Sequence, residues 1–403
     1  MKIGIVGPFN PYTVFDYLTE ESKLKVKPIN DSATSINVLV KSLLEADQNI
    51  VVVTSDFWTS SNIVLSGEQI TIHIVGLKKM NRFLTYFSPL FIKTRRIETC
   101  IDKELSSIDI LHAQWTYYFA YASAKFVNKV PVVCTIRDWA PYIYTCISKF
   151  HLKLFWITQM ITSKMVINNS KIHFIANSYY TQQQILNLHP EYNIPIVFNS
   201  IEDSYILKER ENYPQQYTFI SISPSIEDKR KNCDKLLQAF SLLHHQYPGA
   251  KLIMIGKINF NATLYKKWKE QGLVQNVDFL GYIDHTRLME ILDNVSCLVH
   301  PSLEETFGNI LLEGMSRRVP IIGGESSGAV PDVLKQGKCG CLCDVTNPKS
   351  ITDAMLKVIE NPTYTKSIIN NATTVLLNEY CSSVVAQKHI QIYKSLIKFN
   401  NIQ

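Results

Sequence analysis

The sequence lacks an apolar run long enough to span a bilayer, although 46% of its 403 residues are hydrophobic. A membrane-spanning helix needs about 20 largely apolar residues in succession, so no such helix is expected. The apolar region of a signal peptide is also missing after residues 1–8, which are typical of a first strand and turn. Length and composition therefore predict a globular, cytoplasmic protein of two or three domains.

The sequence also lacks an even, regularly spaced set of cysteines. Its nine cysteines are odd in number and scattered, which excludes a small disulfide framework and predicts reduced thiols. Cys339, Cys341 and Cys343 would share one face of a strand, an arrangement that can contribute metal ligands. Because no second group of ligands lies near them in the sequence, we predict no metal site.

Acidic residues are missing from the whole of 139–190, although the net charge of the chain is only +6. Lysines alternate with aromatic and aliphatic residues there, and the window 77–97 has a similar composition. The basic residues of that window are Lys78, Lys79, Arg82, Lys93, Arg95 and Arg96, and its aromatic residues are Phe83, Tyr86, Phe87 and Phe91. Two interpretations stay open: contact with an anionic membrane surface, or buried helices whose lysines extend to solvent. No nucleic-acid-binding motif accompanies the charge, so nucleic acid is not an expected partner.

Short β-rich runs alternate with helical runs in each half, which predicts parallel sheets covered by helices on both faces. The strands expected in the first half are 2–6, 50–54, 70–75, 108–113, 130–136, 174–177 and 195–199, with a helix at 35–46. The strands expected in the second half are 217–223, 251–256, 277–280, 295–300, 319–323 and 341–345, with helices at 234–247, 286–293, 309–317 and 350–360. A polar segment, 202–216, separates the halves. The prediction is an α/β fold with two doubly wound, Rossmann-like domains, 1–200 and 201–380, that face a central cleft.

An acidic pair, Glu305 and Glu313, lies between the strand expected at 295–300 and the first turns of the next helix. A glycine, Gly308, marks the turn between them. A helix that begins after such a turn offers free N–H groups and the positive end of its dipole to an anion. A carboxylate on each side suits a ligand with a phosphate centre and hydroxyl groups at both ends, which is the shape of a nucleotide sugar.

The segment Glu305-Thr-Phe-Gly-Asn-Ile-Leu-Leu-Glu313 resembles the retaining glycosyltransferases of family 4, which have the GT-B fold. Their hallmark is two glutamates separated by seven residues, with Phe-Gly after the first. The resemblance implies that Glu305 contacts the donor sugar near the reacting carbon and that Glu313 accepts hydrogen bonds from the ribose. It also implies that backbone amides face the sugar and phosphate at Phe307, Gly308, Asn309 and Ile310.

Further donor-side residues follow from the same resemblance. Lys231 matches the family's phosphate-binding lysine, whereas the family's arginine is replaced by Ser223-Pro224, and Arg230 is a candidate substitute. Gly256 ends a strand in the style of the family. Tyr282 follows a similar Phe-Leu-Gly segment, and we expect its backbone to border the base and its ring to lie in the core.

The first half resembles the family less closely. Gly7 and Asn10 lie in the turn after the first strand, on the acceptor side, but the glycine pair usual before the next helix is missing. Arg137 stands where a histidine is common. Because arginine does not act as a base, its catalytic role would be electrostatic. Asp138 is expected either to pair with Arg137 or to contact the acceptor.

The resemblance implies a donor-binding second domain, an acceptor-binding first domain, and a last helix within 381–403 that packs back on the first domain. The implied reaction moves a sugar with retained configuration from a UDP- or GDP-sugar to a saccharide or lipid-linked saccharide, in cell-surface polysaccharide or lipopolysaccharide synthesis. Glu305, Lys231 and Arg137 are the expected catalytic residues, without cofactor or metal. The expected location is the cytoplasm, with peripheral association at the inner face of the membrane. Two alternatives remain: a GT-B epimerase or hydrolase of nucleotide sugars, and a catalytically silent nucleotide-sugar-binding subunit.

Overall fold

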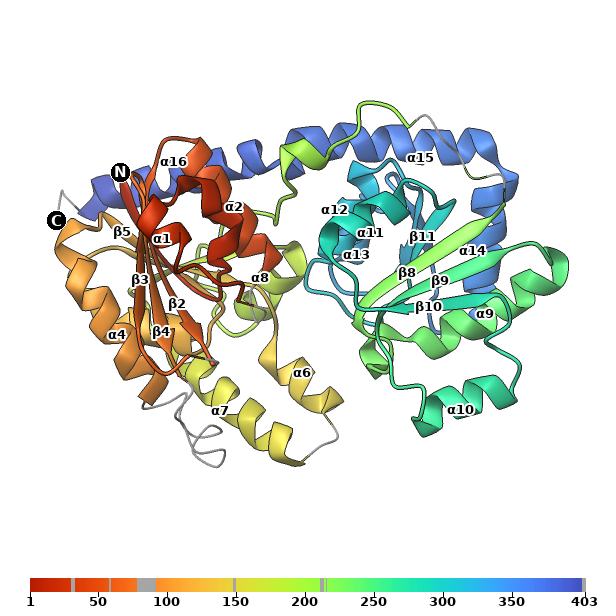
Figure 1. Ribbon diagram of the computed structural model, residues 1–403, viewed down its shortest axis with the longest axis horizontal. Helices are drawn as coiled ribbons and strands as arrows, with labels where there is room; N and C mark the ends of the chain where they lie inside the picture. The colour runs from red at the N-terminus through yellow and green to blue at the C-terminus, as the bar shows by residue number, and fades with distance from the viewer. Residues whose placement is uncertain are drawn as a thin grey trace. The chain divides into compact units, whose positions relative to one another are not determined.

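The computed structural model describes residues 1–29, 33–57, 59–77, 92–147, 150–210, 214 and 216–400. The chain forms two compact units (Figure 1). Unit 1 comprises Met1–Ser200 together with Ser382–Gln403, and unit 2 comprises Ile201–Cys381. Of the helices within the described ranges, none has the length and apolar character needed to cross a membrane.

Unit 1 is built on a seven-stranded sheet with the order β3-β4-β2-β1-β5-β6-β7. Its strands are β1 (Lys2–Val6), β2 (Asn49–Asp56), β3 (Ile63–Ser66), β4 (Ile70–Gly76), β5 (Ile110–Gln114), β6 (Val132–Ile136) and β7 (Ile172–Ala176). All pairings are parallel except that of β3 with β4. The parallel strands are rich in β-branched residues and mostly buried, because helices cover both faces of the sheet.

The first six strands expected in this unit are confirmed, but the prediction of a strand at 195–199 is wrong. Within 195–199 there is only an isolated bridge between Ala176 and Ile196. Pro195 lacks an N–H group, and this weakens strand pairing. The edge strand β3 was not predicted. It is only four residues long and pairs with one strand, so its sequence shows little of the hydrophobic pattern that marks a strand.

Helices cover the sheet of unit 1 on two sides. They are α1 (Glu20–Lys23), α2 (Thr34–Glu45), α4 (Ile92–Glu104), α5 (Tyr118–Ser123), α6 (Ala140–Cys146), α7 (Phe150–Ile167), α8 (Tyr179–Leu186) and α16 (Ser382–Asn400). Residues of α4, α5 and α7 enter one core, and residues of α2 and α16 enter the other. The blue helix α16 packs against the red-orange α2, although more than 300 residues separate them in the sequence (Figure 1).

Unit 2 contains a six-stranded, all-parallel sheet with the order β10-β9-β8-β11-β12-β13. Its strands are β8 (Thr218–Ser225), β9 (Lys251–Lys257), β10 (Val277–Gly281), β11 (Cys297–His300), β12 (Ile321–Gly324) and β13 (Cys341–Cys343). Its helices are α9 (Cys233–Gln246), α10 (Thr263–Glu270), α11 (His285–Leu292), α12 (Asn309–Ser316), α13 (Val330–Val333), α14 (Pro348–Glu360) and α15 (Pro362–Val375). The expected strands and helices of this half are confirmed, with small differences at their ends.

The strand order of unit 2 locates its binding edge. The chain builds β9 and β10 on one side of β8 and then crosses to begin the other side with β11. Ligands of doubly wound sheets bind at the carboxyl ends of the strands where the order reverses in this way. The loops that follow β8 and β11 lie at this edge. They contain Lys231 and Glu305, respectively.

Candidate active site

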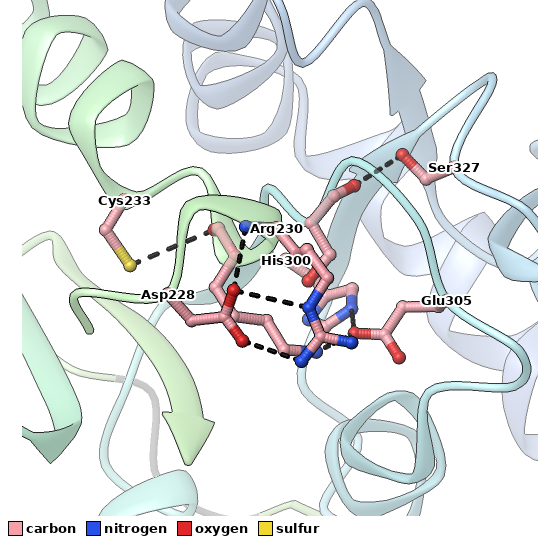
Figure 2. Close-up of polar contacts among 8 residues, drawn as sticks. Asp228, Arg230, Cys233, His300, Glu305 and Ser327 are labelled. Carbon is pink, nitrogen blue, oxygen red and sulfur yellow. Dashed lines mark hydrogen bonds and ion pairs between the residues drawn. The ribbon is translucent and has the colours of Figure 1, made fainter. Parts of the chain in front are cut away.

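The loop after β11 carries Glu305 and is held in place by the loop after β12. The backbone carbonyl of Glu305 accepts a hydrogen bond from the N–H of Ala329 at 2.8 Å. The Ser327 hydroxyl donates to the carbonyl of Ser302 at 2.6 Å (Figure 2). Gly328, between these anchors, has a φ of +60°, and a Cβ added there would lie 2.3 Å from the Glu305 carbonyl oxygen. Only glycine fits so close to this backbone.

The side chain of Glu305 lies between two positively polarised groups. Its carboxylate forms an ion pair with Lys231 and lies 3.2 Å from Nε2 of His300, and only 14% of the side chain is exposed (Figure 2). Burial by itself would raise the pKa of Glu305, but Lys231 and His300 outweigh it and hold that pKa well below its usual range. Glu305 is therefore a fixed carboxylate that accepts hydrogen bonds and has no proton to give near neutral pH.

Lys231 reaches Glu305 from the loop after β8, where a short 3-10 helix, Lys229–Lys231, precedes α9. The next residue, Asn232, has a φ of 54°, and its amide donates to the carbonyls of Pro301 at 3.1 Å and Val345 at 2.7 Å. The N–H of Leu303 in turn donates to the carbonyl of Arg230 at 2.8 Å. The β8 and β11 loops are thus bonded to each other on both sides of Lys231.

Arg230, the candidate substitute for the missing family arginine, turns toward its own loop. Its guanidinium donates to Asp228 at 2.7 and 3.3 Å (Figure 2). Burial raises the pKa of Asp228, but the bonds from Arg230 outweigh this effect and lower it below the ordinary value. In this conformation the arginine stabilises the loop that carries Lys231.

Glu313 lies one turn into α12, which begins after Gly308 in a left-handed conformation with a φ of +86°. Its carboxylate is 3.5 Å from Nε2 of His285, the first residue of α11. The ring of Tyr205 contacts His285 edge-on, with 5.0 Å between ring centroids. The hydrogen bond to Glu313 raises the pKa of His285, against the opposing effect of burial.

His285 and His300 were not predicted as site residues. His300 is the last residue of β11 and lies five positions before Glu305, so its place at the carboxyl end of a strand was a usable signal. His285 gave no comparable signal, because its approach to Glu313 depends on how α11 and α12 pack together.

The other predicted donor-side residues have varied surroundings. The ring of Phe307 is buried against Tyr380, with 6.0 Å between centroids, while Asn309 and Ile310 begin α12 and are partly buried. Gly256 has a φ of +145°, and a Cβ there would lie 2.1 Å from the Ser223 carbonyl oxygen, so the neighbouring strand requires glycine. The expectation of a core ring at Tyr282 is wrong, because this residue is 88% exposed. It follows Gly281, which has a φ of +69° at the end of β10.

In unit 1, the predicted residues Gly7 and Asn10 hold the turn after β1. A Cβ on Gly7 would lie 2.8 Å from Gln114, and the N–H of Gly7 donates to Val53 at 3.1 Å. The Asn10 side chain accepts hydrogen bonds from the backbone N–H groups of Tyr12 and Ile29, both at 3.2 Å. These contacts shape the loop at the carboxyl end of β1.

Arg137 and Asp138 follow β6 and point to different partners. The Arg137 guanidinium donates to Gln114 at 2.8 Å, Asn199 at 2.6 Å and Ser35 at 3.1 Å, and burial lowers its pKa to about 10. Asp138 accepts a hydrogen bond from the hydroxyl of Tyr117. The partners expected for Asp138 were Arg137 and the acceptor, so the contact with Tyr117 was not predicted.

Cys339, Cys341 and Cys343 are buried, with free thiols. Burial raises the pKa of Cys343 to about 12 and that of Cys339 to about 11. Across the described residues, no group of three or more His, Cys, Asp or Glu side chains is placed to hold a metal ion.

Comparison with known families gives two matches that follow one another along the chain. The model described as Glycosyltransferase Family 4 matches residues 32–205. The model described as Glycosyl transferases group 1 matches residues 206–375. The second match contains the loops of Lys231 and Glu305 and the helix of Glu313.

Individual proteins give the same result at low identity. An uncharacterized glycosyltransferase of Methanocaldococcus jannaschii is 22% identical over 71% of this chain and 75% of its own length. The capsular polysaccharide biosynthesis glycosyltransferase CapM of Staphylococcus aureus is 22% identical, and the match covers 50% of each protein. The structure of HepE from Anabaena in complex with UDP-glucose superposes with a TM-score of 0.67 at 15% identity, over 98% of this chain and 100% of that one. The last likeness shows a shared fold.

Proposed function

The chain belongs to the GT-B glycosyltransferases of the family 4 type, and we propose that it transfers a sugar from a nucleoside-diphosphate donor to a saccharide hydroxyl with retained configuration. One observation carries the proposal. Lys231 and His300 flank the ionised carboxylate of Glu305 at the carboxyl ends of β8 and β11, where the strand order of unit 2 reverses.

The donor would lie along this edge with its diphosphate near Lys231 and the start of α12. The first N–H groups of a helix have no partner inside the helix, and they favour an anion. The Glu305 carboxylate would accept hydrogen bonds from two sugar hydroxyls, and Glu313 would accept them from the ribose. The eight-residue separation of the two glutamates thus corresponds to the two ends of the ligand.

In the proposed reaction the site must stabilise the leaving nucleoside diphosphate. When the bond between the anomeric carbon and the phosphate oxygen breaks, negative charge grows on that oxygen. A preorganised ammonium group and backbone amides lower the energy of such a state. Lys231 supplies this cation, so the proposed reaction needs neither a divalent metal nor a cofactor.

Retention follows if the acceptor hydroxyl attacks from the same face as the departing phosphate. The new carbon–oxygen bond then forms as the old one breaks, and the leaving phosphate oxygen takes the proton of the acceptor. Glu305, held between Lys231 and His300, binds hydroxyls instead of attacking carbon. A glycosyl adduct trapped on Glu305 would contradict this mechanism.

We propose unit 1 as the acceptor domain. The turn formed by Gly7 and Asn10, the buried guanidinium of Arg137 and the carboxylate of Asp138 lie after β1 and β6, where acceptor groups would be recognised or positioned. Because the relative CapM is named for capsular polysaccharide biosynthesis, the proposed acceptor is a saccharide or lipid-linked saccharide in cell-surface polysaccharide synthesis.

A panel of UDP- and GDP-sugars, each with and without saccharide acceptors, tests the proposal. We expect one donor to give a glycosylated product whose anomeric configuration, measured by NMR, equals that of the donor, and we expect a chelator to leave the rate unchanged. Epimerised or hydrolysed donor without acceptor would favour the epimerase or hydrolase. Donor binding without any turnover would favour the silent subunit.

A further inference from the structure

Unit 1 contains both basic windows of the sequence, 77–97 and 139–190. In the first window, residues 78–91 lie outside the described residues. Lys93 is only 2% exposed, and its ammonium lies over the ring of Phe57 at 4.3 Å, so it is not available to a surface. Contact of these windows with an anionic membrane therefore stays a prediction. A contact without an assigned role lies in unit 2.

His285 lies beside Glu313, the carboxylate proposed to bind the ribose. It is the first residue of α11, and the side chain of Asp284 caps this helix by accepting a hydrogen bond from the N–H of Arg287 at 2.8 Å. The cap fixes where α11 begins, and so it fixes the point from which the imidazole extends. Glu313 lies one turn into α12. Two helices that are separate in the sequence thus each supply one member of the pair.

The contact leaves part of the Glu313 carboxylate for a ligand. Nε2 of His285 is 3.5 Å from Oε1 of Glu313, and within the ranges that the structure describes no other side chain is bonded to this carboxylate. A carboxylate has about four acceptor positions on its two oxygens, so Oε2 can accept from hydroxyl groups while Oε1 faces the imidazole. The side chain of His285 is 35% exposed, so the pair borders solvent.

The ring of Tyr205 contacts the imidazole of His285 from a third element, the 3-10 helix Asp203–Tyr205. The Tyr205 carbonyl accepts a hydrogen bond from the guanidinium of Arg317 at 3.0 Å, and the same guanidinium donates to Asp293 at 2.6 Å. Arg317 is the residue that ends α12, so Tyr205 is bonded to the helix that carries the carboxylate. An imidazole fixed between these elements loses little conformational freedom when it holds that carboxylate.

The charged groups that shift the pKa of His285 are acidic. The hydrogen bond to Glu313 raises this pKa above its ordinary value of 6.5, burial opposes it, and the charges of Glu313, Glu202 and Asp284 raise it further. The nearest cation described above, Arg317, is paired with Asp293. His285 is therefore protonated at a higher pH than an isolated histidine. A protonated imidazole donates from both ring nitrogens and attracts the carboxylate by its charge.

We propose that His285 is a positioning residue for the nucleotide, which holds Oε1 of Glu313 so that Oε2 receives the ribose hydroxyls. The inference rests on the proposed nucleotide-sugar site and adds a residue to which the family resemblance gave no role. Protonation of His285 strengthens the hold, so donor affinity should fall as the pH rises through the titration of this histidine. Because His285 acts through Glu313 at the ribose, its loss should raise KM for the donor and leave kcat unchanged.

Calorimetric titration with UDP and with GDP tests this role, and the variants are compared on the nucleotide that the wild type binds more tightly. His285→Gln keeps an uncharged donor near the position of Nε2, and His285→Ala removes the donor. At about pH 6 both variants should bind the nucleotide about threefold to fivefold more weakly than the wild type. At about pH 9, where the wild-type histidine is largely neutral, His285→Gln should equal the wild type. Comparison with the wild type at each pH cancels the titration of the nucleotide itself.

Deoxynucleotides separate a role at the ribose from a general effect on the fold. The 2′-deoxy and 3′-deoxy analogues of the same nucleotide each lack a hydroxyl that Glu313 would bind. With at least one of them, His285→Ala should therefore lose most of its effect. The matched control is His245→Gln on α9, which replaces an exposed histidine of unit 2. This control should bind every nucleotide as the wild type does at both pH values.

The outcomes distinguish this inference from the function on which it rests. An equal loss of affinity for the ribonucleotide and for both deoxy analogues would overturn the positioning role. A loss in His285→Gln that is the same at both pH values would overturn the contribution of protonation. A wild type that binds neither UDP nor GDP would contradict the proposed function and this inference with it. Nucleotide binding that neither His285 variant weakens would overturn this inference alone.

Discussion

Neighbouring charges decide the chemical state of Glu305. A carboxylate that is 14% exposed would favour its neutral form if it were alone, yet Lys231 and His300 keep it ionised. Glu313 is as little exposed, at 13%, but its neighbour is His285. The two glutamates of one motif therefore have different partners, and their substitutions should have different consequences.

Replacing each glutamate by glutamine separates these roles. Glu305→Gln should lower kcat about 100-fold, because the amide no longer accepts two hydroxyl hydrogen bonds beside the reacting carbon. Glu313→Gln should weaken donor binding about tenfold, the equivalent of one charged hydrogen bond or about 1.4 kcal/mol. Steady-state kinetics and calorimetric titration with the donor measure the two effects. Equal, negligible effects of both substitutions would refute the assigned roles.

Gly328 is a second residue whose importance is local. An alanine there would bring its Cβ to 2.3 Å from the Glu305 carbonyl oxygen, so the Glu305 loop would have to move. We expect Gly328→Ala to lower kcat at least tenfold, about 1.4 kcal/mol in the barrier. Its matched control is Gly272→Ala, with a φ of +71° and no atom within 4 Å of the added Cβ. The control should cost about 1–2 kcal/mol of unfolding free energy for its backbone conformation and leave kcat unchanged. Equal kcat values for the two variants would show that the close contact between residue 328 and the Glu305 carbonyl does not affect turnover.

At the scale of elements, the site is an arrangement of loops that follow β8, β11 and β12. Asn232 connects two of these loops to the loop after β13 through its bonds to Pro301 and Val345. It also adopts a left-handed conformation where α9 begins. Its side chain and its backbone thus contribute separately to the position of Lys231.

Two substitutions of Asn232 distinguish these contributions. Asn232→Ala should reduce the free energy of unfolding by about 2–4 kcal/mol, because it removes two hydrogen bonds and keeps an unfavourable φ. Asn232→Gly loses the same bonds but tolerates the φ, so it should be about 1 kcal/mol more stable than the alanine variant. Urea denaturation measures both. Equal stability of the two variants would show that the left-handed conformation is not retained.

The pair of His285 and Glu313 connects α11 to α12 and predicts a pH dependence. The pKa of His285 is raised above its ordinary value of 6.5 in the folded protein. Its contribution to stability is therefore complete below the unfolded pKa and is lost as the pH rises through the folded pKa. Glu202 and Asp284, which also raise this pKa, act in the same direction.

His285→Asn should therefore be less stable than the wild type below about pH 6 and equal to it at alkaline pH. The difference should stay below about 1 kcal/mol, because the ring is 35% exposed and water screens the pair. Urea denaturation across this pH range measures it. In Glu313→Gln most of this pH dependence of the unfolding free energy should disappear. If the pH dependence persists in that variant, groups other than the His285–Glu313 pair cause it.

At the scale of the whole molecule, the chain returns to unit 1 after completing unit 2. Helix α16 packs on α2, and the hydroxyl of its Tyr393 is hydrogen-bonded to Nδ1 of the buried His112 at 2.6 Å. His112 is also bonded to Thr135 at 2.7 Å. A polar network thus fixes the last helix to the central strands β5 and β6.

Removal of this hydroxyl should weaken unit 1 alone. Tyr393→Phe leaves a buried ring nitrogen without its partner, which costs about 1–3 kcal/mol. Hydrogen exchange should accelerate in the amides of β5 and β6 and stay unchanged in unit 2. The control is Tyr247→Phe, which removes an exposed bond to Glu360 in unit 2 and should leave exchange in unit 1 unchanged. Equal acceleration in both units would show that the network does not act on unit 1 separately.

The sequence by itself determined the α/β class, nearly every strand of the two sheets, and the segments that contain Lys231, Glu305 and Glu313. These properties depend on hydrophobic periodicity and on turns, which involve residues close together in the chain. The same reasoning failed at 195–199 and at β3, where pairing depends on a single neighbouring strand.

Tertiary structure alone decided which side chains meet. The strand order places the loops after β8 and β11 side by side, so Lys231 contacts a carboxylate 74 residues away. It also brings His285 to Glu313 and turns Tyr282 to solvent. Such contacts depend on how the chain crosses between strands and how helices pack. Local patterns in the sequence therefore do not show which distant side chains come into contact.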